Sequence, residues 1–345
     1  MKVALLTDTH WGARKSSRFL HDYFELFYKN IFFPTLEKEG ITTVIHLGDA
    51  FDNRKGIDFW GLDWTKRVIL EPLSKYDVHM IVGNHDIFLR NSTELNAQEL
   101  LLQEYPNIKT YSSPQTVNIG GLDIMMIPWI CEVNEKQTFE ELKRTKAKVA
   151  MGHLELQGFA VNKTMVMEDH GLKPDIFDKF KRVYSGHFHT RSTNGTVYYL
   201  GNTYQMFWSD VKDERGFHIF DTETLKHTPI NNPYELFHII YYEDNSHQML
   251  DASRYENKIV KIIVRKKSRP QDFEKYIDKL YSAGVQELKI VENHIIEEIE
   301  DFEGCEEENT LSILNRYIDE SEVSHDKTTI KNILQEIYKE ACEVD

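Results

Sequence analysis

The amino-acid sequence predicts an α/β (α+β) fold: a two-sheet sandwich flanked by helices, then a small β-α-β domain and a C-terminal helical hairpin. Strand-like and helix-like segments alternate through residues 2–82, which is typical of a layered sheet with parallel strands. Five short apolar runs each end in Asp, Asn or His. The composition changes near residue 245, where a strand, a helix and another strand form a pattern of their own.

The composition is that of a globular protein with a packed core. The 345 residues allow one large domain and one or two small ones, and 41% of them are hydrophobic. No apolar run approaches the roughly 20 residues that span a bilayer, and none at the amino terminus has the length of a signal peptide. We therefore expect a cytosolic protein without membrane contact. Three widely spaced cysteines argue against a disulfide framework and a structural zinc site.

The net charge of −15 argues against a polyanionic partner when it is taken alone. However, eight of the twelve residues 297–308 are acidic, so much of the charge lies in one segment. Bound divalent cations would also add positive charge at a site. The net charge therefore does not decide the substrate.

The first strand pattern covers residues 2–7, and apolar residues then recur at helical spacing through residues 19–37. Pro34 interrupts this helix, so we expect the helix to end or kink there. Strands at residues 43–47 and 78–82 enclose a helix at residues 63–74. This order of elements predicts parallel strands in one sheet.

Shorter elements follow. Gly120 and Gly121 lie between two apolar runs and predict a hairpin at residues 116–127, and a helix is expected near residues 138–145. Strands at residues 149–151 and 183–185 enclose a segment without clear period, residues 155–171, which we interpret as an active-site loop. The next strand patterns are assigned to a second sheet: residues 197–200, 217–221 and 236–241.

A smaller unit follows the change in composition. Residues 258–265 have a strand pattern, Pro270 opens a helix that Gly284 ends, and residues 285–291 form another strand pattern. The expected domains are residues 1–244, a cap at 245–296, an acidic linker at 297–308 and a helical hairpin at 309–345. The second hairpin helix is capped by Asp326. The apolar faces of the two hairpin helices carry Leu311, Leu314, Ile318, Ile330, Ile333, Leu334, Ile337 and Tyr338.

The five strand ends supply side chains that bind metal or transfer protons. If the strands shared one sheet, these side chains would converge at its carboxyl edge. Any single Asp-x-His or Gly-Asp is more often a turn or a helix cap, whereas the joint pattern favours a metal site. Without a thiolate, the set suits Mn²⁺, Fe²⁺ or Zn²⁺ better than Mg²⁺ or Ca²⁺, and its size suits two ions that share a carboxylate. The candidate ligands are Asp8, His10, Asp49, Asn84, His153, His187 and His189.

These motifs resemble, in order, the five motifs of the calcineurin-like metallophosphoesterases. They are Asp8-x-His10, Gly48-Asp49, Gly83-Asn84-His85-Asp86, Gly152-His153 and Gly186-His187-x-His189. The layout of the whole chain is similar to the SbcD-type nucleases of DNA double-strand-break repair, and most closely to the small subunits of T-even phage recombination nucleases. The resemblance covers nearly the whole chain, from the phosphoesterase domain through the cap to the terminal helices.

The resemblance implies two divalent metal ions, with Mn²⁺ as the expected cofactor. One would be held by Asp8, His10, Asp49 and His189, and the other by Asp49, Asn84, His153 and His187. His85 would contact the scissile phosphate or protonate the leaving oxygen. Many DNA nucleases of this kind have histidine where this chain has Asp52, and an aspartate there resembles the phosphatases, in which it orients the catalytic histidine. We therefore predict a pair of Asp52 and His85.

The resemblance also implies partners: DNA, an ABC-type coiled-coil ATPase subunit docked on the terminal hairpin, and a homodimer within a heterotetramer. If the chain is encoded by a phage, its place is the host cytoplasm. Basic patches that can contact DNA lie beside the bridging aspartate and in the cap, although such patches are more often solvated surface. They are Arg54, Lys55, Arg265, Lys266, Lys267 and Arg269.

Two functions of different classes remain open. The first is a Mn²⁺-dependent DNA exonuclease and endonuclease subunit that acts with an ATPase in recombination, replication and repair. The second is a stand-alone metallophosphatase or cyclic-nucleotide phosphodiesterase. The cap and the terminal helices favour the first, because a small-molecule enzyme has no evident need for them. A scaffold without activity is disfavoured because no expected ligand is missing.

Overall fold

The computed structural model describes residues 1–163, 165–168 and 171–292, with residues 318, 326–328, 330–331 and 333–334. The chain divides into two compact units, Met1–Glu235 and Leu236–Asp345. The boundary lies nine residues before the expected one, because strand β15 (Phe237–Glu243) pairs with the strands of the second unit. Within the described residues, no helix has the length and apolar character to cross a membrane.

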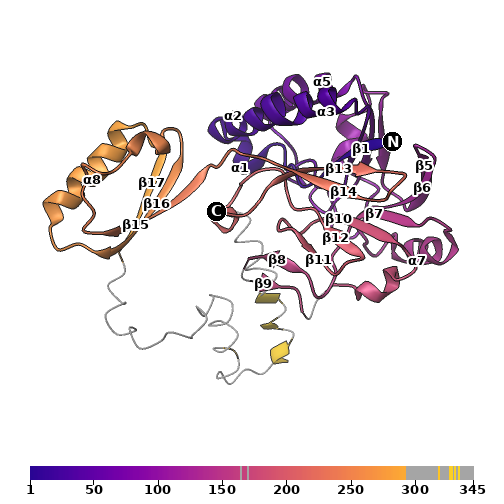
Figure 1. Cartoon of the computed structure of the whole chain (residues 1–345). Helices are drawn as coiled ribbons and strands as arrows, with labels where there is room; N and C mark the ends of the chain where they lie inside the picture. Colours follow the sequence, from indigo (N-terminus) through magenta and orange to yellow (C-terminus); the bar gives the residue numbers. More distant parts are fainter. Residues whose placement is uncertain are drawn as a thin grey trace. The chain divides into compact units, whose positions relative to one another are not determined.

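The first unit contains two six-stranded sheets (Figure 1). The first sheet has the order β14-β13-β1-β2-β3-β4, formed by His227–Asn231, Gly216–Asp221, Lys2–Leu6, Thr43–His46, Asp77–Ile81 and Ile108–Tyr111. The second has the order β11-β12-β10-β7-β6-β5, formed by Ser192–Thr193, Val197–Tyr199, Arg182–Gly186, Val149–His153, Leu122–Ile127 and Gln115–Ile119. The predicted mixed α/β fold with two sheets is confirmed.

Both sheets are parallel at their centres and antiparallel at edges. In the first, β1 to β4 run parallel, and β13 and β14 join antiparallel beside β1. In the second, β6, β7, β10 and β12 run parallel, and the predicted hairpin partner β5 is antiparallel to β6. The carboxyl ends of the central strands therefore gather at one edge of each sheet.

Two of the predicted strand assignments are wrong. The strand expected at residues 217–221 is β13, which belongs to the first sheet beside β1 rather than to the second. The strand expected at residues 236–241 is β15, which belongs to the second unit. The loop expected at residues 155–171 contains a short antiparallel pair, β8 (Ala160–Asn162) and β9 (Met165–Val166).

The helix predicted at residues 19–37 does not end at Pro34. It continues from α2 (Arg18–Phe27) through a π-helical turn, Tyr28–Phe32, into α3 (Phe33–Glu39). Pro34 lies in the first turn of α3, where the changed hydrogen-bond register tolerates its missing N–H. Gly40, with a left-handed φ of 63°, ends the helix.

The second helical segment begins earlier than predicted, at Phe59. Its parts are α4 (Phe59–Thr65), a π-helical turn (Lys66–Leu70) and α5 (Glu71–Leu73). The Asp58 carboxylate accepts the N–H of Gly61 at 2.8 Å and caps the start. The other α-helices described in this unit are α1 (Ala13–Ser16), α6 (Ala97–Leu101) and α7 (Glu135–Arg144).

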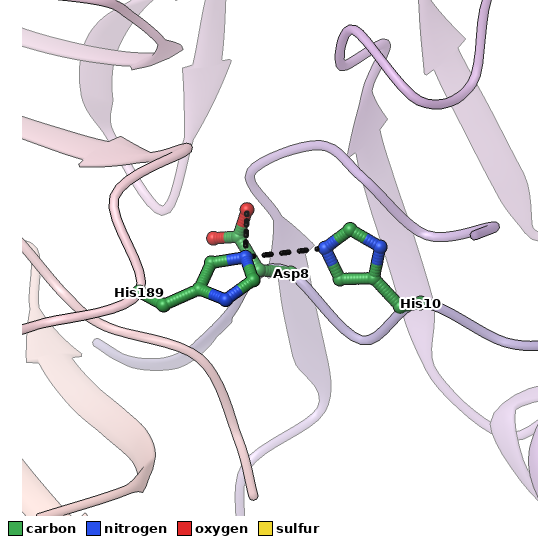
Figure 2. Close-up of side chains that lie close together, drawn as sticks. All are labelled: Asp8, His10 and His189. Atoms are coloured by element: carbon green, nitrogen blue, oxygen red, sulfur yellow. Dashed lines mark hydrogen bonds and ion pairs between the residues drawn. The ribbon is translucent and has the colours of Figure 1, made fainter. Parts of the chain in front are cut away.

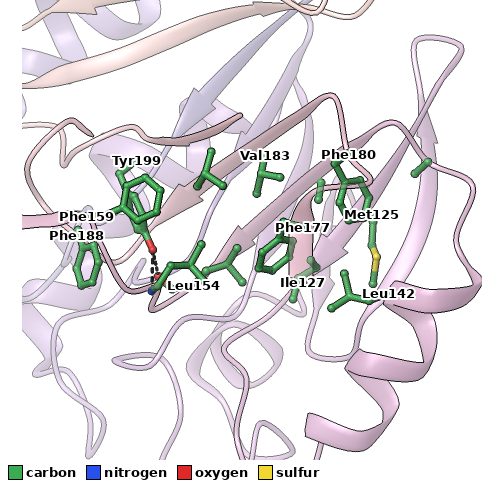
Figure 3. Packing of buried hydrophobic residues seen from close by; sticks show 14 of the residues in the cluster. Met125, Ile127, Leu142, Leu154, Phe159, Phe177, Phe180, Val183, Phe188 and Tyr199 are labelled. Atoms are coloured by element: carbon green, nitrogen blue, oxygen red, sulfur yellow. Dashed lines mark hydrogen bonds between the residues drawn. The ribbon is translucent and has the colours of Figure 1, made fainter. Parts of the chain in front are cut away.

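The core between the sheets is built from both. Val3, Leu5 and Ile45 of the first sheet belong to the same buried cluster as Met126 and Met151 of the second. A further buried cluster includes strands of the second sheet, helix α7 and the segment after β7 (Figure 3). Removing this much apolar surface from water fixes the two sheets face to face.

The second unit has a parallel three-stranded sheet, β15-β16-β17, with β16 at Ile259–Lys266 and β17 at Glu287–Glu292. Helix α8 (Pro270–Ser282) packs Phe273, Tyr276 and Leu280 into its core. The predicted strand, helix and strand are present, with β15 as an additional edge.

Most of the predicted linker and hairpin lies outside the described residues, as do Leu311, Leu314, Ile337 and Tyr338. Of the other hairpin positions, Ile318 is helical and buried, and Ile330 and Leu334 are helical and half-buried. Ile333 is helical and exposed. The Ile330 N–H donates to the Asp326 carbonyl oxygen at 3.1 Å, in agreement with a helix that starts near Asp326. The docking role of this segment stays a prediction.

Candidate metal centre

The seven predicted ligands lie at strand ends, but the strands come from both sheets. Asp8 and His10 follow β1, Asp49 follows β2, and Asn84 follows β3. His153 ends β7 in the second sheet, and His187 and His189 follow β10 there. The idea that all five strands share one sheet is therefore wrong. The side chains still meet, because the sandwich brings corresponding edges of the two sheets together.

One cluster contains Asp8, His10 and His189 (Figure 2), whose ligand atoms lie within 4.8 Å of one another. The Nε2 atoms of His10 and His189 are 3.3 Å apart, and Nε2 of His189 lies 3.9 Å from Asp8 Oδ1. Asp8 and His10 are buried, and His189 is about one-fifth exposed. The cluster therefore joins the end of β1 to the segment after β10.

The second cluster is formed around Asn84. Its Oδ1 lies 2.9 Å from His153 Nε2 and 3.0 Å from His187 Nδ1. Asp49 Oδ2 lies 3.2 Å from the same His153 nitrogen. All four side chains are buried or nearly so.

Asp49 lies between the two clusters. Its Oδ2 is 3.2 Å from His153 Nε2 on one side and 3.9 Å from His10 Nε2 on the other. Its Oδ1 accepts the main-chain N–H of His85 at 2.8 Å. One carboxylate oxygen thus faces both groups, as a bridging ligand requires.

The backbone at the ligands is strained. Asp8, His10, Asp49 and His187 have φ values of 49°, 45°, 53° and 85°, which non-glycine residues seldom adopt. Each such residue costs on the order of 1–3 kcal/mol and persists only where neighbours fix it. Here the loops after β1 and β2 bind each other, since the N–H of His10 donates to the Asp49 carbonyl oxygen at 3.1 Å.

Two glycines permit the close approach of these loops. A Cβ at Gly83 would overlap the Asp49 carboxylate and main-chain nitrogen. A Cβ at Gly186 would overlap the Thr7 hydroxyl and lie 3.0 Å from the Leu47 carbonyl oxygen, so it would push β10 of the second sheet away from the first. The glycines of these two motifs are therefore required for packing.

Asp86 holds the ligand loops together through main-chain groups. Its buried carboxylate accepts three main-chain N–H groups, those of Asp49, Phe51 and Gly83, at 2.8 to 2.9 Å. It thereby joins the loop after β2 to the loop after β3. Asp86 belongs to the polar group that follows the third predicted strand, but this structural role was not predicted from the sequence.

Residues 1–191 match the family model described as calcineurin-like phosphoesterase. The chain belongs to this family. It is also 33% identical over 321 residues to "Exonuclease subunit 1" of Enterobacteria phage T4, and the alignment covers 92% of each protein. Solved structures with similarity include a novel archaeal phosphodiesterase, with 15% identity, a TM-score of 0.35 and coverage of 67% of this chain and 100% of that one. Pseudomonas putida nuclease MPE has 12% identity, a TM-score of 0.26 and coverage of 66% and 87%.

The hydrogen-bond partners of His153 indicate that the second cluster of this calcineurin-like phosphoesterase is suited to bind a cation. His153 Nδ1 lies 2.8 Å from the Leu47 carbonyl oxygen, which only accepts, so Nδ1 carries a proton. If the ring is neutral, Nε2 is then an acceptor, and it faces the acceptor oxygens of Asn84 and Asp49. Such an arrangement needs a proton or a cation at its centre. Imidazole, amide and carboxylate donors together suit a divalent transition metal.

The pKa shifts of these side chains agree with the need for a proton or a cation between them. Burial lowers the pKa of His153, but the Asp49 carboxylate outweighs burial and raises the pKa to about 9. Burial raises the pKa of Asp49, yet His153 and His85 hold it well below the usual range. Burial and the neighbouring His10 lower the pKa of His189, so its ring is neutral at pH 7. A cation would compete with the extra proton on His153, and its binding would release that proton.

The predicted contact between the Asp52 carboxylate and His85 is wrong in its detail. His85 Nδ1 lies 2.7 Å from the main-chain carbonyl oxygen of Asp52. The Asp52 carboxylate instead lies 3.3 Å from Nδ1 of His10. Both histidines are within reach because their rings pack edge to face, with centroids 4.8 Å apart. Asp52 thus supports a predicted metal ligand with its side chain and the predicted acid with its backbone.

The predicted basic patch in the cap is locally neutralised. Each of its four cations forms an ion pair: Arg265 with Glu243, Lys266 with Asp244, Lys267 with Glu292 and Arg269 with Asp272. Lys55 is exposed three residues after Asp52, and Arg54 is half-buried. The DNA contacts of all six residues stay predictions.

Proposed function

We propose that this chain is the nuclease subunit of a DNA-processing complex. It would hydrolyse phosphodiester bonds at DNA ends with Mn²⁺ as cofactor. The observation that carries the proposal is the convergence of seven nitrogen and oxygen donors into two clusters joined by Asp49. The likeness to a phage exonuclease subunit along 92% of both chains supports a nuclease over other phosphoesterases.

The ligands divide between two ions. Asp8, His10, Asp49 and His189 would hold one, and Asp49, Asn84, His153 and His187 the other. When bound, two such ions supply a nucleophile at neutral pH and stabilise both the attacking and the leaving oxygen. Four imidazoles in the set favour Mn²⁺ over Mg²⁺, which prefers oxygen donors.

His85 would act on the leaving group. Its main-chain N–H is held by Asp49, and its Nδ1 proton is held by the Asp52 carbonyl oxygen, so the orientation of the ring is fixed at two points. In the imidazolium form, Nε2 would donate a proton to the leaving oxygen or hold a phosphate oxygen. The exposed Lys55 and the half-buried Arg54, close in sequence to Asp52, are suited to adjacent phosphates of a strand.

The partners would be an ABC-type ATPase and a second copy of this chain, in a heterotetramer within the host cytoplasm. The amphipathic helices after residue 309 are the proposed ATPase-docking element, because such helices bind grooves through an apolar face. Removal of the chain from Asn309 onward should leave a metal-binding phosphoesterase that no longer co-purifies with the ATPase. Retained co-purification would place the docking site elsewhere.

The direct test compares substrates. The Mn²⁺-loaded chain is incubated with end-labelled linear DNA, with bis(p-nitrophenyl) phosphate and with a phosphomonoester, and Asn84→Ala is the matched inactive variant. Mn²⁺-dependent release of nucleotides from DNA that is lost in the variant would support the proposal. Hydrolysis of the small esters without any action on DNA would favour a stand-alone phosphatase or cyclic-nucleotide phosphodiesterase.

A further inference from the structure

Glu155 is an acidic side chain at the metal centre that the motifs do not contain. It follows the ligand His153 by two residues, and its side chain is only 16% exposed. Its Oε1 lies 3.5 Å from Nε2 of His187. The other ring nitrogen of His187, Nδ1, lies 3.0 Å from Asn84 Oδ1 inside the second cluster. One imidazole therefore spans the distance between Glu155 and the cluster.

We propose that Glu155 is a positioning residue that orients His187 for metal binding. A carboxylate only accepts, so His187 carries its proton on Nε2 and donates it to Glu155. Nδ1 is then unprotonated and directed at the second cluster. The inference rests on the proposed metal-dependent function, because it assigns Glu155 to one of the two metal sites.

The contact matters because the imidazole ring of His187 has an alternative orientation. Its main chain is fixed, since its N–H donates to Asp8 Oδ1 at 3.0 Å, but rotation of the ring would exchange Nδ1 for a carbon. A partner on the far nitrogen prevents this rotation and makes the ligand nitrogen more basic. His153 has such a partner in the Leu47 carbonyl oxygen, and the Asp52 carboxylate lies 3.3 Å from Nδ1 of His10.

Hydrogen bonds hold the backbone on both sides of Glu155. Leu154 and Leu156 are buried in the cluster beside the second sheet. The Tyr199 hydroxyl donates to the Leu154 carbonyl oxygen at 2.9 Å and accepts the Leu156 N–H at 3.1 Å. With both neighbours fixed in the core, the Glu155 side chain has a defined starting point.

Leu172, later in the same loop, also supports the Glu155 backbone. The Leu172 N–H donates to the Glu155 carbonyl oxygen at 2.9 Å. Gly171 has a φ of 87°, and a Cβ there would lie 2.7 Å from the same carbonyl oxygen, so only glycine fits. A carboxylate on such a rigid support can hold a metal ligand within the narrow limits that binding requires.

The test is a Mn²⁺ titration of the metal-free full chain by calorimetry. Glu155→Ala should weaken one of the two Mn²⁺ sites by about 10- to 100-fold and leave the other unchanged. Glu155→Gln retains an oxygen acceptor and should recover part of the loss. Glu168→Gln, which changes an exposed carboxylate of the same loop, should bind as the wild type does.

Nitrogen-15 spectra of the histidine rings in the metal-free chain give a second readout, because Glu155→Ala should lose the Nε2-protonated form of His187. Wild-type affinity at both sites in Glu155→Ala, or equal loss at both, would overturn the proposal for Glu155. A wild-type chain that binds no Mn²⁺ would instead overturn the proposed function.

Discussion

Gly186→Ala tests whether the metal centre depends on the close approach of the two sheets. A Cβ at this position would overlap the Thr7 hydroxyl and lie 2.9 Å from Asp8 Oδ2 and 3.0 Å from the Leu47 carbonyl oxygen. Thr7 donates to Asp8 Oδ2 at 2.7 Å, so Thr7 cannot turn away without losing that bond. The contact at Leu47 is with its main-chain carbonyl oxygen, which cannot rotate away as a side chain can. The end of β10 must therefore retreat from the first sheet.

The retreat has two expected consequences. Overpacking of a buried site costs about 1–3 kcal/mol of unfolding free energy. Displacement of His187 and His189 relative to Asp8 affects the metal centre more strongly, because an error of about 1 Å in such a site costs about 10² in rate. We expect Gly186→Ala to fold, with turnover of a chromogenic phosphodiester and Mn²⁺ affinity both reduced by about 10².

The matched control is Gly195→Ala, in the turn between β11 and β12 of the same sheet. Its φ of 93° penalises alanine, but no atom lies within 4 Å of the new Cβ. Urea denaturation should show a stability loss of about 1–3 kcal/mol, without a change in Mn²⁺ affinity. Wild-type turnover and affinity in Gly186→Ala, or equal losses of activity in the two variants, would refute the role of sheet approach.

Four further outcomes are expected. Asp49→Asn should lose more than one Mn²⁺ per chain in elemental analysis after desalting, because the residue faces both clusters; two retained ions would contradict a bridge. Asp52→Asn should weaken Mn²⁺ binding in calorimetry by about 10-fold through His10, and unchanged binding would show that their contact is unimportant. His85→Gln should slow turnover by about 10² or more for a poor leaving group and less for a nitrophenyl ester, at constant metal content; a uniform loss would exclude proton donation. Burial, together with the charges of Arg191 and His227, lowers the pKa of His218 to about 3, so the unfolded chain takes up a proton on this ring at a higher pH than the folded chain does. The free energy of unfolding therefore falls as the pH drops below about 6.5. In urea denaturation, His218→Gln should remove about 2 kcal/mol of the loss in unfolding free energy between pH 7 and 5, and an unchanged pH slope would contradict this.

The positions of the ligands could be predicted from the sequence because each follows a short apolar run directly. Strands β1, β2, β3, β7 and β10 occur within one or two residues of the predicted runs. Such runs are local signals, since a buried parallel strand is apolar on both faces. The same signal contains no information on the pairing partner. For this reason the sequence did not show that β13 joins β1 or that β15 leaves the first unit.

Residues that act through another residue were harder to predict. Asp86 binds three main-chain N–H groups from two loops, and Glu155 approaches a histidine 32 positions later in the chain. Acidic residues are common, and nothing in their spacing distinguishes a buried carboxylate from a solvated one. A weak signal existed at Glu155, because the flanking Leu154 and Leu156 show that alternate side chains are buried there.

Asp52 illustrates the limit of a motif more sharply. It lies three positions after Asp49, and this spacing allows its carboxylate to reach either His10 or His85. The choice depends on how the loop after β2 lies against the loop after β1, where the Trp11 N–H donates to the Ala50 carbonyl oxygen at 2.8 Å and the Asp52 N–H to the Trp11 carbonyl oxygen at 3.1 Å. These two bonds hold Asp52 beside the β1 loop, so its side chain faces His10 while its carbonyl group faces His85. Because the bonds are between main-chain atoms, side-chain identity could not have revealed them.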